Sequence, residues 1–190
     1  GIAVFNAPFS NTRSVVELAL AEIIMLMRNI FEKSNLLHKG IWDKSAKGSY
    51  EIRGKKIGII GYGKIGSQLS VLAEDLGMEV YYYDVVDKLA LGNAKKCNSL
   101  SELLKKSDII TLHIDGSSEN TNYIGEKEFK LMKSGVIFLN LSRGHVVDIN
   151  ALVKNISSGK IRGASVDVFP DEPTGNDEKF ISGLQNLPNV

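Results

Sequence analysis

The sequence predicts an α/β fold in which helices cover both faces of a doubly wound parallel sheet. From residue 55 onward, short apolar runs alternate with stretches of helical character, which is typical of parallel strands joined by crossover helices. The apolar runs predict strands at residues 56–60, 79–83, 109–114, 136–141 and 163–168. The intervening stretches predict helices near residues 64–76, 100–106, 125–133 and 149–158. Helix stops are expected at Gly77, Gly135 and Gly159, and a helix start at Asp148.

A long apolar helix precedes this alternating part. Ser14 and Glu17 have the spacing of a capping box, which predicts a helix from about residue 14 to residue 30. Glu17, Glu22 and Arg28 interrupt and close the apolar run, so it does not predict a membrane span. Because this helix is apolar on nearly every side, we expect burial against another domain or subunit, with ordinary core as the alternative.

Length and composition favour a single domain. The 190 residues, 43% of them hydrophobic, can bury one substantial core. We predict one domain over residues 1–190, with N-terminal helices and a linker in 1–54 and the α/β core in 55–190. The irregular stretch that begins at Gly1 has no initiator Met, and we expect the chain to be a piece of a longer protein.

The charge balance and the cysteine content indicate which partners and which cellular compartment to expect. The 23 basic and 22 acidic residues nearly cancel, so no basic field predicts binding to nucleic acid. The one cysteine, Cys97, cannot form an internal disulfide, which is typical of a reducing compartment and predicts a cytoplasmic location. Its thiol is expected to be an inert, small apolar group.

The stretch KKIGIIGYGKIGSQL, residues 55–69, carries a glycine fingerprint between a predicted strand and a predicted helix. In this context Gly61 permits a tight turn, Gly63 lets a pyrophosphate approach the backbone, and Gly66 lets helix and strand pack closely. Asp84 ends the next predicted strand, where a carboxylate accepts hydrogen bonds from ribose hydroxyls. The motif predicts a Rossmann-type dinucleotide site, against the alternative of a glycine-rich turn without a ligand. Asp84 and Asp87 favour NAD over NADP, and FAD is disfavoured.

The carboxyl ends of the later strands hold further chemistry. In NLSRGHVVD, Arg143 follows a strand and can grip a carboxylate through two parallel hydrogen bonds. In VDVFPDEP, Asp167 and Glu172 flank a proline turn. Taken singly, Arg143 would be interpreted as a surface arginine paired with an acid.

Four motifs in order resemble one enzyme family over the whole chain. NAPFSNTRSVVE, RGKKIGIIGYGKIGSQL, NLSRGHVVD and DVFPDEP are similar to segments of the NAD-dependent D-2-hydroxyacid dehydrogenases, and most of all to bacterial-type phosphoglycerate dehydrogenases. The resemblance implies that Arg143 binds the substrate carboxylate and carbonyl, that Glu172 pairs with a catalytic histidine, and that Asn11 contacts substrate. It implies hydride transfer between NAD and a D-2-hydroxy acid, with 3-phosphoglycerate in serine biosynthesis as the expected substrate.

The resemblance also assigns a cofactor-binding set. Lys64 and Ile65 would contact the pyrophosphate, and Leu141, Ser142 and Asp167 the nicotinamide side, while His113 stands at a strand end that lines the cofactor cleft. With the three glycines of the fingerprint and His113, which its strand-end position suggests, the full set is Gly61, Gly63, Lys64, Ile65, Gly66, Asp84, His113, Leu141, Ser142, Arg143 and Asp167. No residue is assigned to a metal, and the expected partners are a small-molecule substrate and a second copy of the cofactor domain, without a membrane or nucleic acid.

The sequence departs from the family pattern at several places, and these departures bear on the activity expected of the chain by itself. Asp115 stands where many relatives carry proline, and His145 occupies a variable position of the arginine motif. The family's acid/base histidine follows the strand that LPNV would begin, so we expect it, and both halves of the substrate domain, to lie outside the chain. His38, His113 and His145 are not expected to replace it, and the chain alone is expected to be inactive. The alternative function is an NAD-sensing, dimeric corepressor of the same fold.

Overall fold

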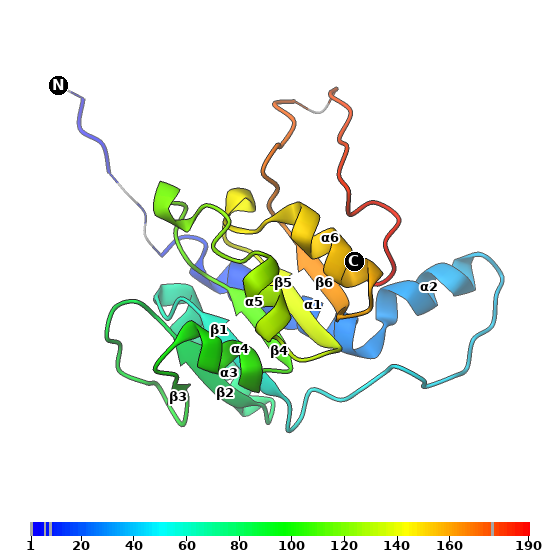
Figure 1. Cartoon of the computed structure of the whole chain (residues 1–190), viewed down its shortest axis with the longest axis horizontal. Helices are drawn as coiled ribbons and strands as arrows, with labels where there is room; N and C mark the ends of the chain where they lie inside the picture. The colour runs from blue at the N-terminus through cyan, green and yellow to red at the C-terminus, as the bar shows by residue number, and fades with distance from the viewer. Residues whose placement is uncertain (1, 6, 8, 176) are drawn as a thin grey trace.

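The computed structural model describes residues 2–5, 7, 9–175 and 177–190 and contains one six-stranded parallel sheet (Figure 1). Its strand order is β3-β2-β1-β4-β5-β6, the order of a doubly wound dinucleotide-binding sheet. The strands are β1 (Lys56–Ile60), β2 (Glu79–Tyr83), β3 (Lys95–Lys96), β4 (Ile109–Leu112), β5 (Val136–Asn140) and β6 (Ile161–Val166). The predicted fold class is therefore confirmed.

Helices cover both faces of the sheet. The α-helices are α1 (Thr12–Arg28), α2 (Ile30–His38), α3 (Lys64–Asp75), α4 (Leu100–Lys106), α5 (Glu126–Leu131) and α6 (Ile149–Ser157), with short 3-10 turns η1 (Ser118–Asn120) and η2 (Gly144–Val146). One buried cluster joins the sheet to α4, α5 and α6 through Leu103, Phe129 and Leu152. The other joins it to α1 and α3 through Ile23 and Leu69. Each face of the sheet is thus buried under its own set of helices. Burial on both faces explains the continuously apolar strands.

Most predicted elements lie within a few residues of the observed ones. The strand predicted at 109–114 ends at Leu112, and His113 and Ile114 beyond it line a cavity. The strand predicted at 163–168 is Ile161–Val166, since Arg162 and Gly163 interrupt the apolar pattern although Ile161 pairs with Val136. β3 was not predicted, because two lysines carry no strand signal and the pairing with Tyr81 and Tyr82 alone defines it.

The predicted start of the long helix is wrong. The helix begins at Thr12, and the Ser14 hydroxyl donates to the Asn11 carbonyl at 2.9 Å instead of capping the helix. Glu17 pairs with Arg13 one turn earlier at 2.7 Å, so it cannot complete a capping box. Asn29, with φ of 53°, ends α1 in a left-handed conformation and lets α2 follow at once.

The α1 helix is amphipathic in its packing although its sequence is apolar nearly all round. Val16, Ala19 and Ile23 are completely buried on the side that contacts α3, β5 and β6. On other sides Leu18 is 38% and Met25 39% exposed. The structure therefore leaves part of the apolar helix uncovered. Within the described ranges, no helix is both long and apolar enough to cross a membrane.

Candidate functional site

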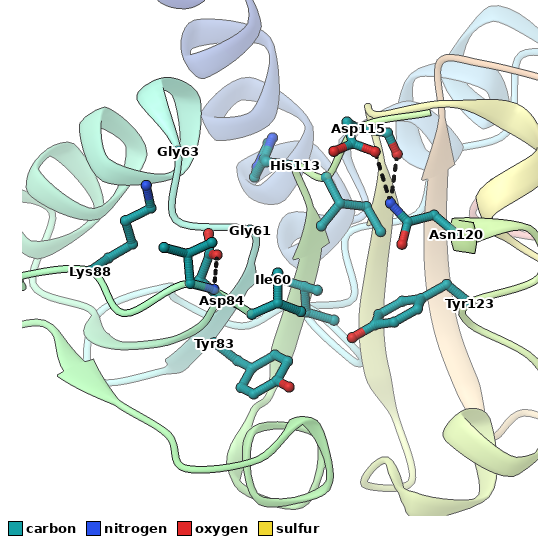
Figure 2. A pocket seen from close by; sticks show the side chains of 13 residues that line it. Ile60, Gly61, Gly63, Tyr83, Asp84, Lys88, His113, Asp115, Asn120 and Tyr123 are labelled. Atoms are coloured by element: carbon teal, nitrogen blue, oxygen red, sulfur yellow. Dashed lines mark hydrogen bonds between the residues drawn. The ribbon is translucent and has the colours of Figure 1, made fainter. Parts of the chain in front are cut away.

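The carboxyl ends of β1, β2 and β4 enclose a cavity of about 340 Å³ (Figure 2). Parallel strands that end at one edge of an open sheet place their following loops side by side, and ligands bind there. The cavity is lined by Ile60, Gly61, Gly63, Tyr83, Asp84, Val85, Val86, Lys88, His113, Ile114, Asp115, Asn120 and Tyr123. Four of the predicted cofactor residues, Gly61, Gly63, Asp84 and His113, meet here.

The three glycines of the fingerprint have three different geometries. Gly61 has φ of +91°, and a Cβ there would come within 2.5 Å of the His113 carbonyl oxygen. A Cβ at Gly66 would run into the Gly61 carbonyl, so this position holds α3 close to β1. At Gly63 a Cβ would meet no described atom within 4 Å, and this residue caps the N-terminus of α3, where free N–H groups and the helix dipole favour an anion. This geometry leaves Gly63 and the N-terminus of α3 open to an anion.

Asp84 follows β2, and its side chain ties the end of this strand to the loop that follows β1. Its Oδ2 accepts from the Tyr62 backbone N–H at 2.7 Å, and its Oδ1 accepts from the Val86 N–H at 2.8 Å. A carboxylate oxygen has more than one lone pair, so both oxygens retain capacity for ribose hydroxyls. Asp87 does not share this role, because its side chain pairs with Lys96 and is absent from the cavity lining. The expectation that both aspartates face the ribose end is therefore wrong for Asp87, and Lys88 lines the cavity in its place.

His113 lies at the end of β4 with a shielded ring. Its Nε2 is 3.0 Å from the Thr111 hydroxyl, and its buried Nδ1 has no hydrogen-bond partner among the described residues. Burial lowers the pKa of the imidazole to about 4, since the low-dielectric surroundings disfavour the charged form. The ring is therefore neutral near pH 7.

A second group of predicted residues lies at the ends of β5 and β6, outside the lining of this cavity. Buried Asn140 organises it: its Nδ2 donates to the Arg143 carbonyl at 3.0 Å, and its Oδ1 accepts from the Ser142 N–H and hydroxyl. Its backbone carbonyl accepts from the Asp167 N–H at 3.1 Å. Sequence reasoning missed Asn140, although a single amide at the end of the apolar run VIFLN was the available signal.

Arg143 presents its side chain to solvent from this turn. Its Nη1 donates to the Ser142 carbonyl at 2.6 Å, and no carboxylate of the described residues lies within ion-pairing distance. The turn that follows is held in place because Gly144 packs directly against the backbone of Phe169 and Pro170. The loops after β5 and β6 are thereby fixed against each other, with a guanidinium available for an anionic ligand.

Two glutamates lie in the neighbourhood of Asp167: Glu172 lines a cavity together with it, and Glu22 is close enough for the two charges to interact. Exposed Glu172 accepts from the Phe169 backbone N–H at 2.8 Å, which fixes the proline turn. Glu22 approaches from α1, where burial raises the pKa of its carboxyl, the Ser165 hydroxyl opposes this by hydrogen bonding, and the Asp167 charge adds to it. In the sequence, Glu22 was recognisable only as an interruption of an apolar run.

The remaining predicted residues lie at the starts of α1 and α3 and just after β5. Asn11 precedes α1 without making a side-chain cap. Lys64 begins α3, and its Nζ lies 3.8 Å from the centre of the Phe9 ring. Ile65 is partly buried against the α1 and α3 cluster, and Leu141 is buried there. Asn6 and Pro8 of the NAPFSNTRSVVE motif lie outside the described residues.

Comparison with known families decides the classification of this site. Residues 20–190 match the family model described as the D-isomer specific 2-hydroxyacid dehydrogenase, NAD binding domain. The chain belongs to the D-isomer specific 2-hydroxyacid dehydrogenase family. The glycine cradle, the α3 N-terminus and Asp84 fit NAD, and this member of the family is an NAD-binding domain.

Individual relatives agree with this family. The chain is 54% identical over all 190 residues to D-3-phosphoglycerate dehydrogenase of Haemophilus influenzae and covers 46% of that protein. It is 50% identical to D-3-phosphoglycerate dehydrogenase 1 of Saccharomyces cerevisiae, of which it covers 42%. Among solved structures, D-lactate dehydrogenase with NAD+ from Lactobacillus jensenii superposes with a TM-score of 0.89 at 30% identity, over 100% of this chain and 60% of that one. The chain thus spans less than half the length of these two curated relatives.

Proposed function

We propose that the chain is the cofactor domain of an NAD-dependent D-2-hydroxyacid dehydrogenase that converts 3-phosphoglycerate to 3-phosphohydroxypyruvate in serine biosynthesis. The observation that carries this proposal is the 54% identity, over the whole chain, to a D-3-phosphoglycerate dehydrogenase. The chain covers 46% of that relative, so the activity and the substrate of a whole protein are part of the proposal. An NAD-sensing corepressor is the weaker alternative, because the relatives named above are dehydrogenases.

Within this proposal the residues at the ends of β1, β2 and β4 bind one part of the cofactor, and the residues at the ends of β5 and β6 bind the other. Gly61, Gly63 and Gly66 hold the pyrophosphate with Lys64 and Ile65, and Asp84 binds the adenosine ribose. His113 lines the same cavity. The nicotinamide side is formed by the ends of β5 and β6, where Leu141, Ser142, Arg143 and Asp167 follow their strands.

The proposed reaction is a hydride transfer in which residues near the ends of β5 and β6 bind and orient the substrate. NAD, when bound, supplies the hydride acceptor for C2 of the 2-hydroxy acid. Arg143 binds the substrate carboxylate through its free guanidinium N–H groups and stabilises negative charge on the carbonyl oxygen. Glu172 orients the histidine that carries the hydroxyl proton, and Asn11 contacts the substrate. Buried Asn140 keeps the Arg143 turn in position.

Asp84 should set the cofactor preference. We expect the chain to bind NADH more tightly than NADPH, because the 2′-phosphate would meet the Asp84 carboxylate at the ribose end. Asp84→Ala should reduce the difference by weakening NADH binding and by removing the repulsion of NADPH. Titration of both cofactors by fluorescence measures this, with Asp87→Ala as a matched control that leaves the ratio unchanged. Equal binding of the two by the unaltered chain would refute the role of Asp84.

We also propose that the chain forms a two-fold dimer through α1, α2 and the segment after them. Support comes from apolar side chains that the domain leaves uncovered there: Leu18, Met25, Ile30, Phe31, Leu37, Ile41 and Trp42 are between 38% and 78% exposed. Apolar surface of this extent is typical of an interface.

The proposal further includes a single domain over residues 1–190. It also includes a reducing, cytoplasmic location, which agrees with one buried thiol. Nucleic-acid partners are not part of it, in agreement with a near-neutral net charge.

Assembly can be tested by sedimentation at micromolar concentration. The unaltered chain is expected to sediment as a dimer, and Leu37→Asp as a monomer, because a charge would then have to be desolvated in the interface. Val71→Asp, which changes a 39% exposed residue of α3 outside the proposed surface, serves as the control and should leave the dimer intact. A monomeric unaltered chain would contradict the proposal.

A further inference from the structure

The cofactor cavity has a polar wall opposite the ribose-binding carboxylate. In Figure 2, Asn120 and Tyr123 lie on one side of the cavity, and Asp84 and Lys88 lie on the other. A pyrophosphate at Gly63 and a ribose at Asp84 would place the base further along this cavity, whose remaining lining includes Val85, Asn120 and Tyr123. The wall is therefore positioned against the base of the dinucleotide.

Asp115 fixes the orientation of the Asn120 amide. The Asn120 side-chain Nδ2 donates to the Asp115 backbone carbonyl and to its Oδ1, both at 3.0 Å. The Ser117 backbone N–H donates to the same Oδ1 at 2.9 Å, which holds the carboxylate in place. Both groups that face the amide can only accept, so the atom turned toward them must be the nitrogen. The Asn120 oxygen consequently points away from Asp115.

Two hydrogen-bonding groups of this wall are unused. The Asn120 Oδ1 accepts no hydrogen bond, and the Tyr123 hydroxyl makes none, within the part of the chain that the structure describes. Neither atom is among the fully shielded ones, and both belong to residues that line the cavity. Burial raises the pKa of the Tyr123 phenol, and the nearby Tyr83, Glu128 and Asp84 raise it further, so the hydroxyl keeps its proton. The wall thus offers one obligatory acceptor and one group that can donate.

We infer that Asn120 and Tyr123 read the edge of the adenine base, with Asp115 as the positioning residue of Asn120. Adenine presents a 6-amino donor beside a ring-nitrogen acceptor, which matches an amide oxygen beside a hydroxyl. Hypoxanthine presents a 6-carbonyl oxygen instead, which would face the Asn120 oxygen with two acceptors opposed. This assignment rests on the proposed placement of the cofactor in this cavity and adds recognition of the base to it.

The test compares NADH with reduced nicotinamide hypoxanthine dinucleotide, which differs from it only at the base. The unaltered chain is expected to bind NADH about tenfold more tightly or better, because a site that is built to bond an amino group rejects the analogue that lacks it. Asn120→Leu should bring the two affinities within about twofold of each other. Tyr123→Phe should weaken NADH binding about three- to tenfold, and Tyr50→Phe, at the opposite end of the sheet, should change neither value.

The positioning role of Asp115 has its own test with the same two ligands. Asp115→Ala frees the Asn120 amide to turn over, so the preference for adenine should fall, whereas Asp115→Asn retains an acceptor and should restore the preference. Equal affinities of the unaltered chain for the two dinucleotides, or an unchanged ratio in Asn120→Leu, would overturn the inference and leave the cofactor site standing. Failure to bind NADH at all would overturn both.

Discussion

The 190-residue chain, assayed by itself with NADH and 3-phosphohydroxypyruvate, is expected to show no measurable turnover. None of its three histidines is proposed as the proton donor. His38 is exposed at the end of α2, and His145 lines a separate cavity with Asp148 and Phe169. His113 has a pKa of about 4 and is neutral at pH 7. General acid assistance is worth about 10² to 10⁴ in rate, and positioning of the substrate between two domains adds to this.

The assay needs a parallel measurement of NADH binding by the same preparation. Binding without turnover is the expected combination, because Gly61, Gly63 and Asp84, which we propose for the pyrophosphate and the adenosine ribose, line one cavity of the chain. A longer protein that contains this chain serves as the active control. Turnover by the chain alone that is lost in His145→Gln or His113→Gln would identify that histidine as the acid and refute the proposed division of roles.

Arg143→Ala, made in a longer protein that contains this chain, is expected to lower kcat/KM on the order of 10²-fold or more, by analogy with the loss of one charge-stabilising donor. Within the described residues the guanidinium donates one hydrogen bond, to the Ser142 carbonyl, and its other N–H groups are available for a carboxylate. Steady-state kinetics measures the loss, and NAD affinity should stay nearly the same.

Two matched variants separate the role of Arg143 from a loss of charge or of folding. Arg143→Lys keeps the charge but not the planar pair of donors, so its activity should fall between that of the unaltered protein and that of Arg143→Ala. Arg13→Ala removes an exposed arginine that pairs with Glu17 on α1, and it should have wild-type activity. If Arg143→Ala keeps full activity, the assignment of this residue to the substrate carboxylate is wrong.

The strands and the glycine loop could be predicted because their signals are local. Apolar runs of about five residues mark β1, β2 and β5, and Gly61 must be glycine whatever surrounds it, since its φ is +91°. The helix start could not be predicted in the same way. Ser14 and Glu17 have the spacing of a capping box, but Arg13 competes for the carboxylate and the Ser14 hydroxyl bonds backward to Asn11.

The sequence by itself determined that this protein has a parallel α/β sheet and a glycine loop at the start of a helix. Both are read from residues close together in the chain, the sheet from hydrophobic periodicity and the loop from the spacing of its glycines. Tertiary structure alone decided which further side chains line the cavity beside the predicted residues Gly61, Gly63, Asp84 and His113. Asp84 meets the Tyr62 backbone across 22 positions, whereas Asp87, close to it in sequence, turns away to Lys96. Asn120 and Tyr123 come to face Asp84 because β4 pairs beside β1. Such contacts depend on strand order and loop packing, which bring together residues far apart in the chain.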